Sequence, residues 1–479
     1  MAKKKWIWPS MVIAFAGLSA GASPYAGDIP VPSARVQRIS HGRFHDLTMY
    51  SPPGPPISVV LYLSGKDGWN SLNEDLAMQL AQRGAMVAGV DLPRFVADLE
   101  TDSGQCVFPD GDLENLSHFV QAYYHLPTYL RPLLIGYSSG ATLAYGVLAQ
   151  APQDTFAGAL TMEFCPTYVS SKPPCKGSGL EFSLQAHGRK MDFLPAKKLG
   201  DPWVNLTIED GAVCKAKAIR EFVDQIPAAR SVVIPRIGAN PGAARQWAAP
   251  LNAAFGQLMA RHPARQVALP PAALGDLPVV EVPAKSGAPA TDTFAIIMSG
   301  DGGWAGLDED VAAALAARGI PVVGLDSLRY YWTKRTPEGV AADTDKIIRY
   351  YLAHLNKSRA MLIGYSQGAD VLPFAVNRLP AATRGRVSLA AVMGMSEHAL
   401  FEFHLTSWVA DDNSGPATMP EMNRITGMPA LCIYGEDESD SLCPKLNPAK
   451  IKIVKLKGGH HFNGDYAGLA QQILSAAKP

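Results

Sequence analysis

The sequence predicts two tandem domains, each a doubly wound α/β structure built around a mostly parallel sheet. The chain has 479 residues, too many for one ordinary hydrophobic core. Apolar runs of strand length alternate with helix-like stretches, as expected for successive βαβ units. In addition, "VVLYLSGKDGWNSLNEDLAMQLAQRGAMVAGVDLPRF" from Val59 recurs as "AIIMSGDGGWAGLDEDVAAALAARGIPVVGLDSLRY" from Ala295. A repeat of this length indicates duplication of a whole domain.

The N-terminus is typical of a secretory signal peptide. Lysines occupy positions 3–5, an apolar run covers Met11–Ala20, and small residues follow it. The run is short for a membrane span, so we expect residues 1–26 to be removed and the mature protein to be a soluble periplasmic or secreted protein. Six cysteines suit that oxidising compartment. Cys432 and Cys443 are the only two in the second half, and we expect them to pair.

The two domains are expected to cover residues 30–262 and 270–479. Arg261–Asp292 begins rich in proline and alanine, as linkers often are, which puts the boundary near residue 270. Apolar residues make up 47% of the chain and charged residues 18%, which favours globular packing over disorder. The 43 basic and 43 acidic side chains balance, so the composition does not indicate binding to nucleic acid.

The strands of the second half can be predicted one by one. Each is a short apolar run bounded by glycine, proline or polar residues. Between the second and third predicted strands come a glycine-rich turn and an amphipathic helical pattern that ends at Arg318-Gly319. The predicted strands are Pro278–Val282, Thr293–Met298, Pro321–Leu325, Arg359–Ile363, Leu389–Met393, Ala430–Tyr434 and Lys450–Leu456.

A Gly-x-Ser-x-Gly motif occurs once in each half, between a predicted strand and a predicted helix. "LLIGYSSGAT" contains Ser138, and "MLIGYSQGAD" contains Ser366. In a nucleophile elbow of this kind the sharp strand-to-helix turn exposes the serine hydroxyl, and the helix N-terminus faces developing negative charge. The two motifs therefore raise the question of whether the protein has one active site or two.

The second half also has an acid and a base in the order that α/β-hydrolases use. After the predicted strand at Ala430 comes "GEDESDSLCP", in which we place Asp437 slightly ahead of Glu438 as the acid. After the last strand comes "KGGHHFNGDY", in which His460 follows two glycines and is favoured over His461 as the base. Both loops follow carboxyl ends of strands, the edge where Ser366 is expected. The fold class is thus two tandem α/β-hydrolase-like, doubly wound, mostly parallel-sheet domains.

The loop "MSGDGGW" is expected to supply part of an oxyanion hole. It follows the strand Thr293–Met298, where α/β-hydrolases place one of the two amide donors. The backbone N–H of Asp301 or Gly302 would be one donor and that of Gln367 the other. Preorganised donors of this kind stabilise the charge that develops on the carbonyl oxygen.

The first half lacks a histidine at the place of the base. Its elbow is intact, but Gly238-Ala239-Asn240-Pro241 replaces the Gly-Gly-His-His sequence. A serine hydroxyl without a base is essentially unreactive. We therefore expect one active site, at Ser366. The first domain is expected to be a binding or scaffolding module.

The second half resembles the bacterial VirJ virulence-protein family, and the two-domain chain looks like the longer AcvB-type members. The residues that carry the resemblance include "GYSQGADVLPF", "FEFHLTSW", "YGEDESDSLCP" and "KGGHHFNGDY". The resemblance implies a periplasmic hydrolase, without cofactor or metal, that cleaves the aminoacyl ester of lysyl-phosphatidylglycerol. It also implies a link to virulence and type IV secretion, with secretion-system or exported proteins as partners. The alternative is a non-enzymatic periplasmic factor that escorts secreted proteins.

A cationic lysyl group would need carboxylates near Ser366. Such residues occur in the loops at the carboxyl edge of the predicted sheet and in the segment Phe401–Asp412. The aromatic residues of that segment are suited to lipid contact. The candidates are Asp301, Trp304, Asp326, Glu402, His404, Asp411 and Asp412. The expected partner is an aminoacylated phospholipid at the periplasmic membrane surface, and no nucleic acid.

Overall fold

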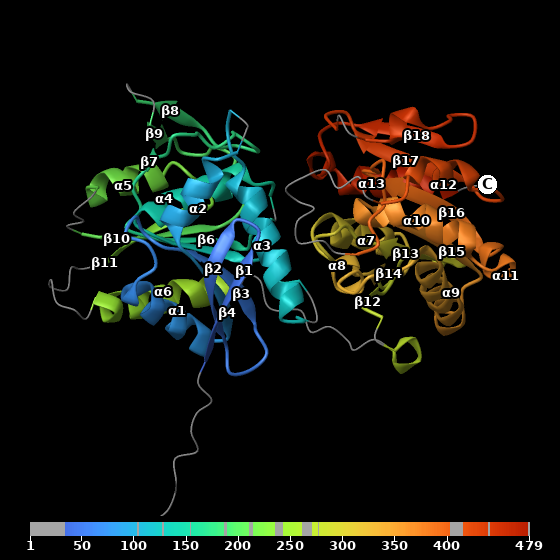
Figure 1. Ribbon diagram of the computed structural model, residues 1–479, viewed down its shortest axis with the longest axis horizontal. Helices are drawn as coiled ribbons and strands as arrows, with labels where there is room; N and C mark the ends of the chain where they lie inside the picture. The colour runs from blue at the N-terminus through green and yellow to red at the C-terminus, as the bar shows by residue number, and fades with distance from the viewer. Residues whose placement is uncertain are drawn as a thin grey trace, which may run out of the picture. The chain divides into compact units, whose positions relative to one another are not determined.

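Each half of the chain is built around its own sheet, with helices on both faces (Figure 1). The structure is a computed structural model. It describes residues 34–102, 105–126, 129–153, 155–185, 189–209, 214–234, 243–260, 271–275, 277–402, 415–438 and 441–477. The predicted signal peptide and the predicted domain boundary near residue 270 lie outside these residues.

The second half contains a seven-stranded sheet in the order β12-β14-β13-β15-β16-β17-β18. Every pair is parallel except β12–β14, which is antiparallel. The strands are β12 (Val279–Val282), β13 (Thr293–Met298), β14 (Val322–Leu325), β15 (Arg359–Tyr365), β16 (Val387–Met393), β17 (Ala430–Gly435) and β18 (Lys452–Leu456). All seven predicted strands are confirmed, with ends that differ by two residues at most.

Helices cover both faces of this sheet and bury its apolar side chains. Leu315 of α7 (Leu307–Ala316) and Ile473 of α13 (Tyr466–Ala477) share a cluster with one face. The other face packs against α9 (Pro337–His354), α10 (Gln367–Arg378) and α12 (Thr418–Arg424). Two short helices, α8 (Ser327–Tyr330) and α11 (Ala381–Arg384), complete this half. Strands buried on both faces account for the continuous apolar runs in the sequence.

The first half repeats this arrangement. Its eight-stranded sheet has the order β1-β2-β4-β3-β5-β6-β10-β11. The run β4-β3-β5-β6-β10-β11 corresponds to the run β14-β13-β15-β16-β17-β18 of the second half. The strands are β1 (Arg35–His41), β2 (Phe44–Ser51), β3 (Ser58–Leu63), β4 (Ala85–Val90), β5 (Leu133–Tyr137), β6 (Gly158–Met162), β10 (Trp203–Ile208) and β11 (Ala229–Ile234). The helices are α1 (Ser71–Gln82), α2 (Leu92–Leu99), α3 (Pro109–Tyr123), α4 (Ser139–Gln150), α5 (Ala216–Val223) and α6 (Ala243–Met259).

The first half also contains a three-stranded antiparallel sheet that the sequence did not predict. It is formed by β7 (Thr167–Val169), β9 (Lys190–Phe193) and β8 (Phe182–Leu184). Three- and four-residue strands are too short for a period of two residues to stand out in the sequence. The hydrogen bonds that define this sheet come from tertiary contact.

Three disulfides lie within the halves, two in the first and one in the second. They join Cys106 to Cys175, Cys165 to Cys214, and Cys432 to Cys443. The predicted pairing in the second half is therefore confirmed. Among the residues that the structure describes, no helix has the length and apolar character needed to cross a membrane.

Candidate active site

Ser366 lies at the turn between β15 and α10, in a backbone conformation that few residues other than glycine adopt. Its φ is 52° and its ψ is −122°. A Cβ atom on Gly364 would lie 2.3 Å from the carbonyl oxygen of Gly368, and one on Gly368 would lie 2.1 Å from that of Met298. Only glycine fits at either position, so the motif is required by backbone packing. A strained serine that begins a helix is the geometry of a nucleophile elbow.

His460 is paired with Glu438. Its Nδ1 lies 2.5 Å from Oε1 of Glu438, and Oε2 of the same carboxylate accepts a hydrogen bond from the Gly435 amide at 2.6 Å. Burial raises the pKa of Glu438, but the hydrogen bonds from His460 and Gly435 outweigh burial and hold that pKa below its usual value. Glu438 is therefore an ionised acceptor that orients the imidazole.

The preference for Asp437 over Glu438 was wrong about this contact. Asp437 is exposed, whereas the side chain of Glu438 is only 6% exposed and faces His460. The chain turns after β17, with the Glu438 amide donating to the Gly435 carbonyl, and this turn directs Glu438 inward. Neighbouring acids in one turn point in different directions, so spacing in the sequence did not separate them.

His461 makes different contacts. Its Nδ1 lies 3.3 Å from the hydroxyl of Tyr365, and no contact with Glu438 within hydrogen-bond distance is found for it among the described residues. Burial lowers the pKa of His461, against the opposing effect of nearby carboxylates that include Glu114. His461 therefore contacts Tyr365 rather than the acid, and His460 is the better candidate base.

The predicted oxyanion loop lies against Ser366. A Cβ atom on Gly300 would be 3.3 Å from the Cβ of Ser366. One of the predicted donors, the amide of Gly302, already donates to Oδ1 of Asp301 at 3.0 Å. The amide of Gln367 belongs to the first turn of α10, where backbone N–H groups lack an acceptor within the helix. The Asp301 amide also donates to its own carboxylate, so Gln367 is the clearer candidate donor, and Asp301 and Gly302 both stay candidates for the second one.

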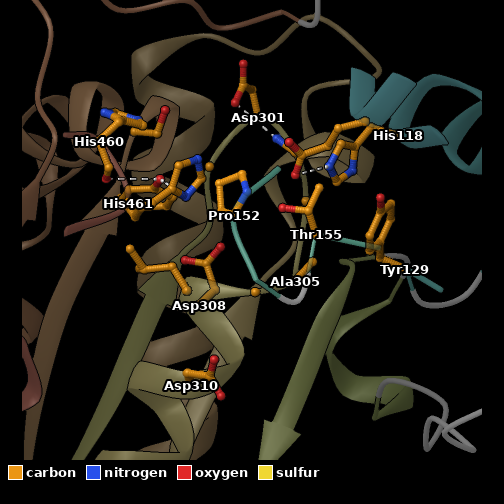
Figure 2. Close-up of a pocket in the computed structure, with 18 of the residues that line it drawn as sticks. His118, Tyr129, Pro152, Thr155, Asp301, Ala305, Asp308, Asp310, His460 and His461 are labelled. Carbon is orange, nitrogen blue, oxygen red and sulfur yellow. Dashed lines mark hydrogen bonds and ion pairs between the residues drawn. The ribbon is translucent and has the colours of Figure 1, made fainter. Parts of the chain in front are cut away.

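A cavity of about 300 Å³ brings these groups together. Residues 34–479 form one compact unit, and both halves of that unit line the cavity. Figure 2 shows His460 and His461 on the side opposite His118, which projects from α3 of the first half. The lining residues include Glu114, His118, Tyr129, Asp301, Asp308, Asp310, Tyr365, Ser366, His460 and His461.

Two candidate substrate residues turn out to be structural. Trp304 is 2% exposed and packs on β14, where a Cβ atom on Gly324 would lie 2.2 Å from its ring. Asp326 is 3% exposed and caps α8 by accepting from the Arg329 amide at 3.1 Å. Neither residue lines the cavity. In this structure both side chains are used for packing and capping at the edge of the sheet.

The remaining candidates lie elsewhere or are not described. Glu402 forms an ion pair with Lys334, 3.2 Å away, and does not line the cavity. His404, Asp411 and Asp412 lie outside the described residues. Conversely, sequence reasoning missed Asp308 and Glu114, which do line the cavity. Asp308 looked like one of several helix-start acids, and Glu114 belongs to the other half.

The first half keeps the elbow but has glutamate where the second half has the glycine beside His460. Ser138 has φ 53° and ψ −116°, nearly the angles of Ser366. Next to it Glu163 takes the position that Gly394 holds in the second half, and it hydrogen-bonds to Tyr137, whose pKa is raised to about 12, chiefly by burial and then by Glu163. The segment that replaces the histidine loop, residues 238–241, lies outside the described residues.

Comparison with known protein families agrees with this duplication. A model described as "Bacterial virulence protein (VirJ)" matches residues 57–162 and 292–479, more than half of the chain. The chain belongs to the VirJ family. The two matched ranges contain both elbows, and the second also contains Glu438 and His460. A comparison with curated protein sequences found no match.

Among solved structures, this VirJ-family chain is similar to several hydrolases at low identity. It is 16% identical to a dienelactone hydrolase from Anabaena variabilis, with 49% of this chain and 100% of that chain covered and a TM-score of 0.32. It is 13% identical to Est1E from Butyrivibrio proteoclasticus, with 48% and 99% covered and a TM-score of 0.32. It is 15% identical to an alpha-beta serine hydrolase homologue from Coxiella burnetii, with 48% of this chain and 99% of that chain covered and a TM-score of 0.30. We infer no substrate from these likenesses.

Proposed function

We propose that this protein is a periplasmic serine esterase that hydrolyses the aminoacyl ester of lysyl-phosphatidylglycerol to lysine and phosphatidylglycerol. The observation that carries the proposal is the 2.5 Å contact between His460 and Glu438 in the cavity that Ser366 also lines. A hydroxyl, an imidazole and a carboxylate in this order are the groups of a nucleophilic acyl transfer.

The residues imply a two-step reaction. Because Glu438 holds Nδ1 of His460, the Nε2 atom is left to take the proton from Ser366 as its oxygen attacks the lysyl carbonyl carbon. The amides of Gln367 and of Asp301 or Gly302 would stabilise the negative charge on the carbonyl oxygen. His460 then protonates the departing glycerol oxygen, leaving an acyl-enzyme. Water, deprotonated by His460, releases lysine and restores the serine.

The choice of substrate rests on family membership and on the charge of the cavity. The VirJ family resemblance implies an aminoacylated phospholipid. The cavity supports a cationic acyl group, because its lining has four acidic residues, Glu114, Asp301, Asp308 and Asp310, against one arginine, Arg131. An acidic lining attracts a lysyl group and disfavours a free fatty acid or a phosphate monoester.

The test uses the purified full-length mature protein and vesicles that contain lysyl-phosphatidylglycerol. We expect wild type to release lysine, Ser366→Ala to release none above background, and a fluorophosphonate probe to label wild type alone. If wild type neither releases lysine nor reacts with the probe, the proposal is wrong and a non-enzymatic escort role becomes the better explanation. The location is tested with a reporter protein fused to this chain. For a periplasmic protein we expect the reporter to be protected from external protease in intact cells and to lose that protection on osmotic shock.

A further inference from the structure

Asp308 presents a carboxylate oxygen that no protein group satisfies. The residue is 2% exposed, lies in the first turn of α7 and lines the same cavity as Ser366. Figure 2 shows it among the side chains that line this cavity. Its Oδ1 has no hydrogen-bond partner among the described residues. Burying a carboxylate without a partner costs free energy, so such groups are rare unless a ligand completes them.

The duplicated half shows what this position looks like when its role is purely structural. At the constant offset by which Trp69 matches Trp304, Asp308 corresponds to Asn73. Asn73 is fully satisfied: its Nδ2 donates to the Tyr62 hydroxyl at 3.1 Å, and its Oδ1 accepts from the Asn70 amide at 3.3 Å. In the second half Ile297 stands in place of Tyr62 and has no polar side-chain atom. The half with the histidine base therefore has an acid here and lacks the structural partner.

A second position of the cavity changes in the same direction. Asp301 corresponds to Lys66 of the first half, a reversal of charge next to the nucleophile. Burial raises the pKa of Asp301, and His460 and His118 oppose that effect. Both differences thus add negative charge where the Ser–His–Glu set is complete.

The first half contributes a third acid to the same cavity. Glu114 on α3 lines it, and its Oε1 lies 3.8 Å from Nε2 of His118. His118 in turn contacts the oxyanion loop, since its Nε2 would be 3.0 Å from a Cβ atom on Gly302. The first half is therefore in contact with the loop that faces Ser366.

We propose that Asp308, together with Asp301 and Glu114, binds the ammonium group of a cationic acyl chain whose ester carbonyl is held at Ser366. Asp308 is the central contact, because its free oxygen can accept a charge-assisted hydrogen bond that the protein itself does not supply. Glu114 makes the first half part of the binding site for the acyl chain. This inference rests on the proposed ester hydrolysis and identifies the residues that select its substrate.

The test compares three ethyl esters of one carbon-chain length: lysine, norleucine and hexanoic acid, with the released acid measured by chromatography. Lysine carries two ammonium groups, norleucine one and hexanoic acid none. We expect Asp308→Asn, which installs the residue of the first half, to lower kcat/KM for the lysyl ester by about 10- to 100-fold through KM, as for a lost hydrogen bond to a charged group. The kcat/KM for the hexanoyl ester should change by less than about two-fold. The norleucyl ester, which has one ammonium group, shows which of the two ammonium groups of lysine Asp308 binds.

The matched control is Glu309→Gln, which removes a carboxylate from the same turn of α7 but does not line the cavity. Glu309→Gln should leave the ranking of the three esters by kcat/KM unchanged. An equal loss of activity on all three esters in Asp308→Asn would show a structural role and overturn the subsite. If wild type cleaves none of the esters, or if Ser366→Ala cleaves them as well as wild type, the proposed function itself fails.

The part assigned to the first half has its own test. Glu114→Gln in the full chain should reduce the preference for the lysyl over the hexanoyl ester, because kcat/KM should fall more for the lysyl than for the hexanoyl ester. An unchanged preference would remove Glu114 from the subsite. Thermal unfolding of both variants checks the fold. Burial raises the pKa of Asp308 well above its usual value, so the neutral amide of Asp308→Asn should be tolerated and this variant should unfold no earlier than wild type.

Discussion

Gly394 makes the space in which His460 lies. A Cβ atom on Gly394 would be 2.6 Å from Cε1 of His460 and 3.3 Å from Oε1 of Glu438. The first half has Glu163 at this position: both residues follow the last residue of the matched strand, and both have positive φ, 61° for Gly394 and 56° for Glu163. Glutamate thus stands where the second half has the glycine that leaves room for His460. In addition, the sequence at 238–241 has no histidine.

Gly394→Ala should abolish the proposed ester hydrolysis without unfolding the protein. The added methyl group must displace His460, and an error of about 1 Å in the position of a catalytic group can cost about 100-fold in rate. The measurement is kcat on a soluble ester together with the unfolding temperature. Gly427→Ala is the matched control, because Gly427 also has a positive φ of 80° but nothing within 4 Å of its Cβ position. Equal activity losses in the two variants would show that backbone strain, rather than displacement of His460, is responsible.

Glu438→Gln should lower kcat by two orders of magnitude or more, because an amide cannot hold His460 in the tautomer that leaves Nε2 free. Asp437→Asn, one residue away and exposed, should retain activity close to wild type. The check is kcat of both variants on the same ester. The opposite ranking would mean that the turn after β17 rearranges when substrate binds.

The two adjacent histidines should behave differently. His460→Ala should lose several orders of magnitude in kcat, as expected for removal of a base from a catalytic set that acts as a unit. His461→Ala should keep activity within about ten-fold, since His461 contacts Tyr365 rather than the acid. Steady-state kinetics of the two variants decide between them, and an inactive His461→Ala with a normal His460→Ala would reverse the assignment.

Ser138 should be dispensable for turnover. Ser138→Ala in the full chain is expected to leave kcat and KM on a soluble ester within about two-fold of wild type, because no base is available to activate that hydroxyl. Fluorophosphonate labelling of the Ser366→Ala variant gives an independent readout. Labelling at Ser138 in that variant would show a second reactive serine and contradict the one-site interpretation.

Asp110 should make stability depend on pH. Burial raises the pKa of this carboxyl, on α3, to about 7, above its unfolded value of 3.8. The folded protein therefore holds the proton more tightly, and stability falls as pH rises from about 4 to about 7. Asp110→Asn mimics the protonated form, so it should raise the unfolding temperature by about 3 °C or more at pH 8 and by less at pH 5. A larger gain at pH 5 than at pH 8 would contradict this sign.

Particular residues show how far sequence reasoning reached. The seven strands of the second half were predictable because strands buried on both faces are continuous apolar runs. The position of Ser366 was predictable because glycines stand at the two motif positions where a Cβ atom would meet backbone, Gly364 against Gly368 within the turn and Gly368 against Met298 of β13. The pairing of Glu438 with His460 was not, since it depends on how two loops after different strands meet.

The sequence by itself determined the duplication, the doubly wound fold of each half and the disulfide between Cys432 and Cys443, since these follow from local pattern and from how few partners are available. Only the tertiary structure decided which side chains share the cavity. Trp304 and Asp326 were directed into packing and capping, while Asp308 was left with an unsatisfied oxygen. Glu114 entered the cavity from the other half. Side-chain direction and contact between residues far apart in the chain depend on the packed fold, which local sequence patterns do not encode.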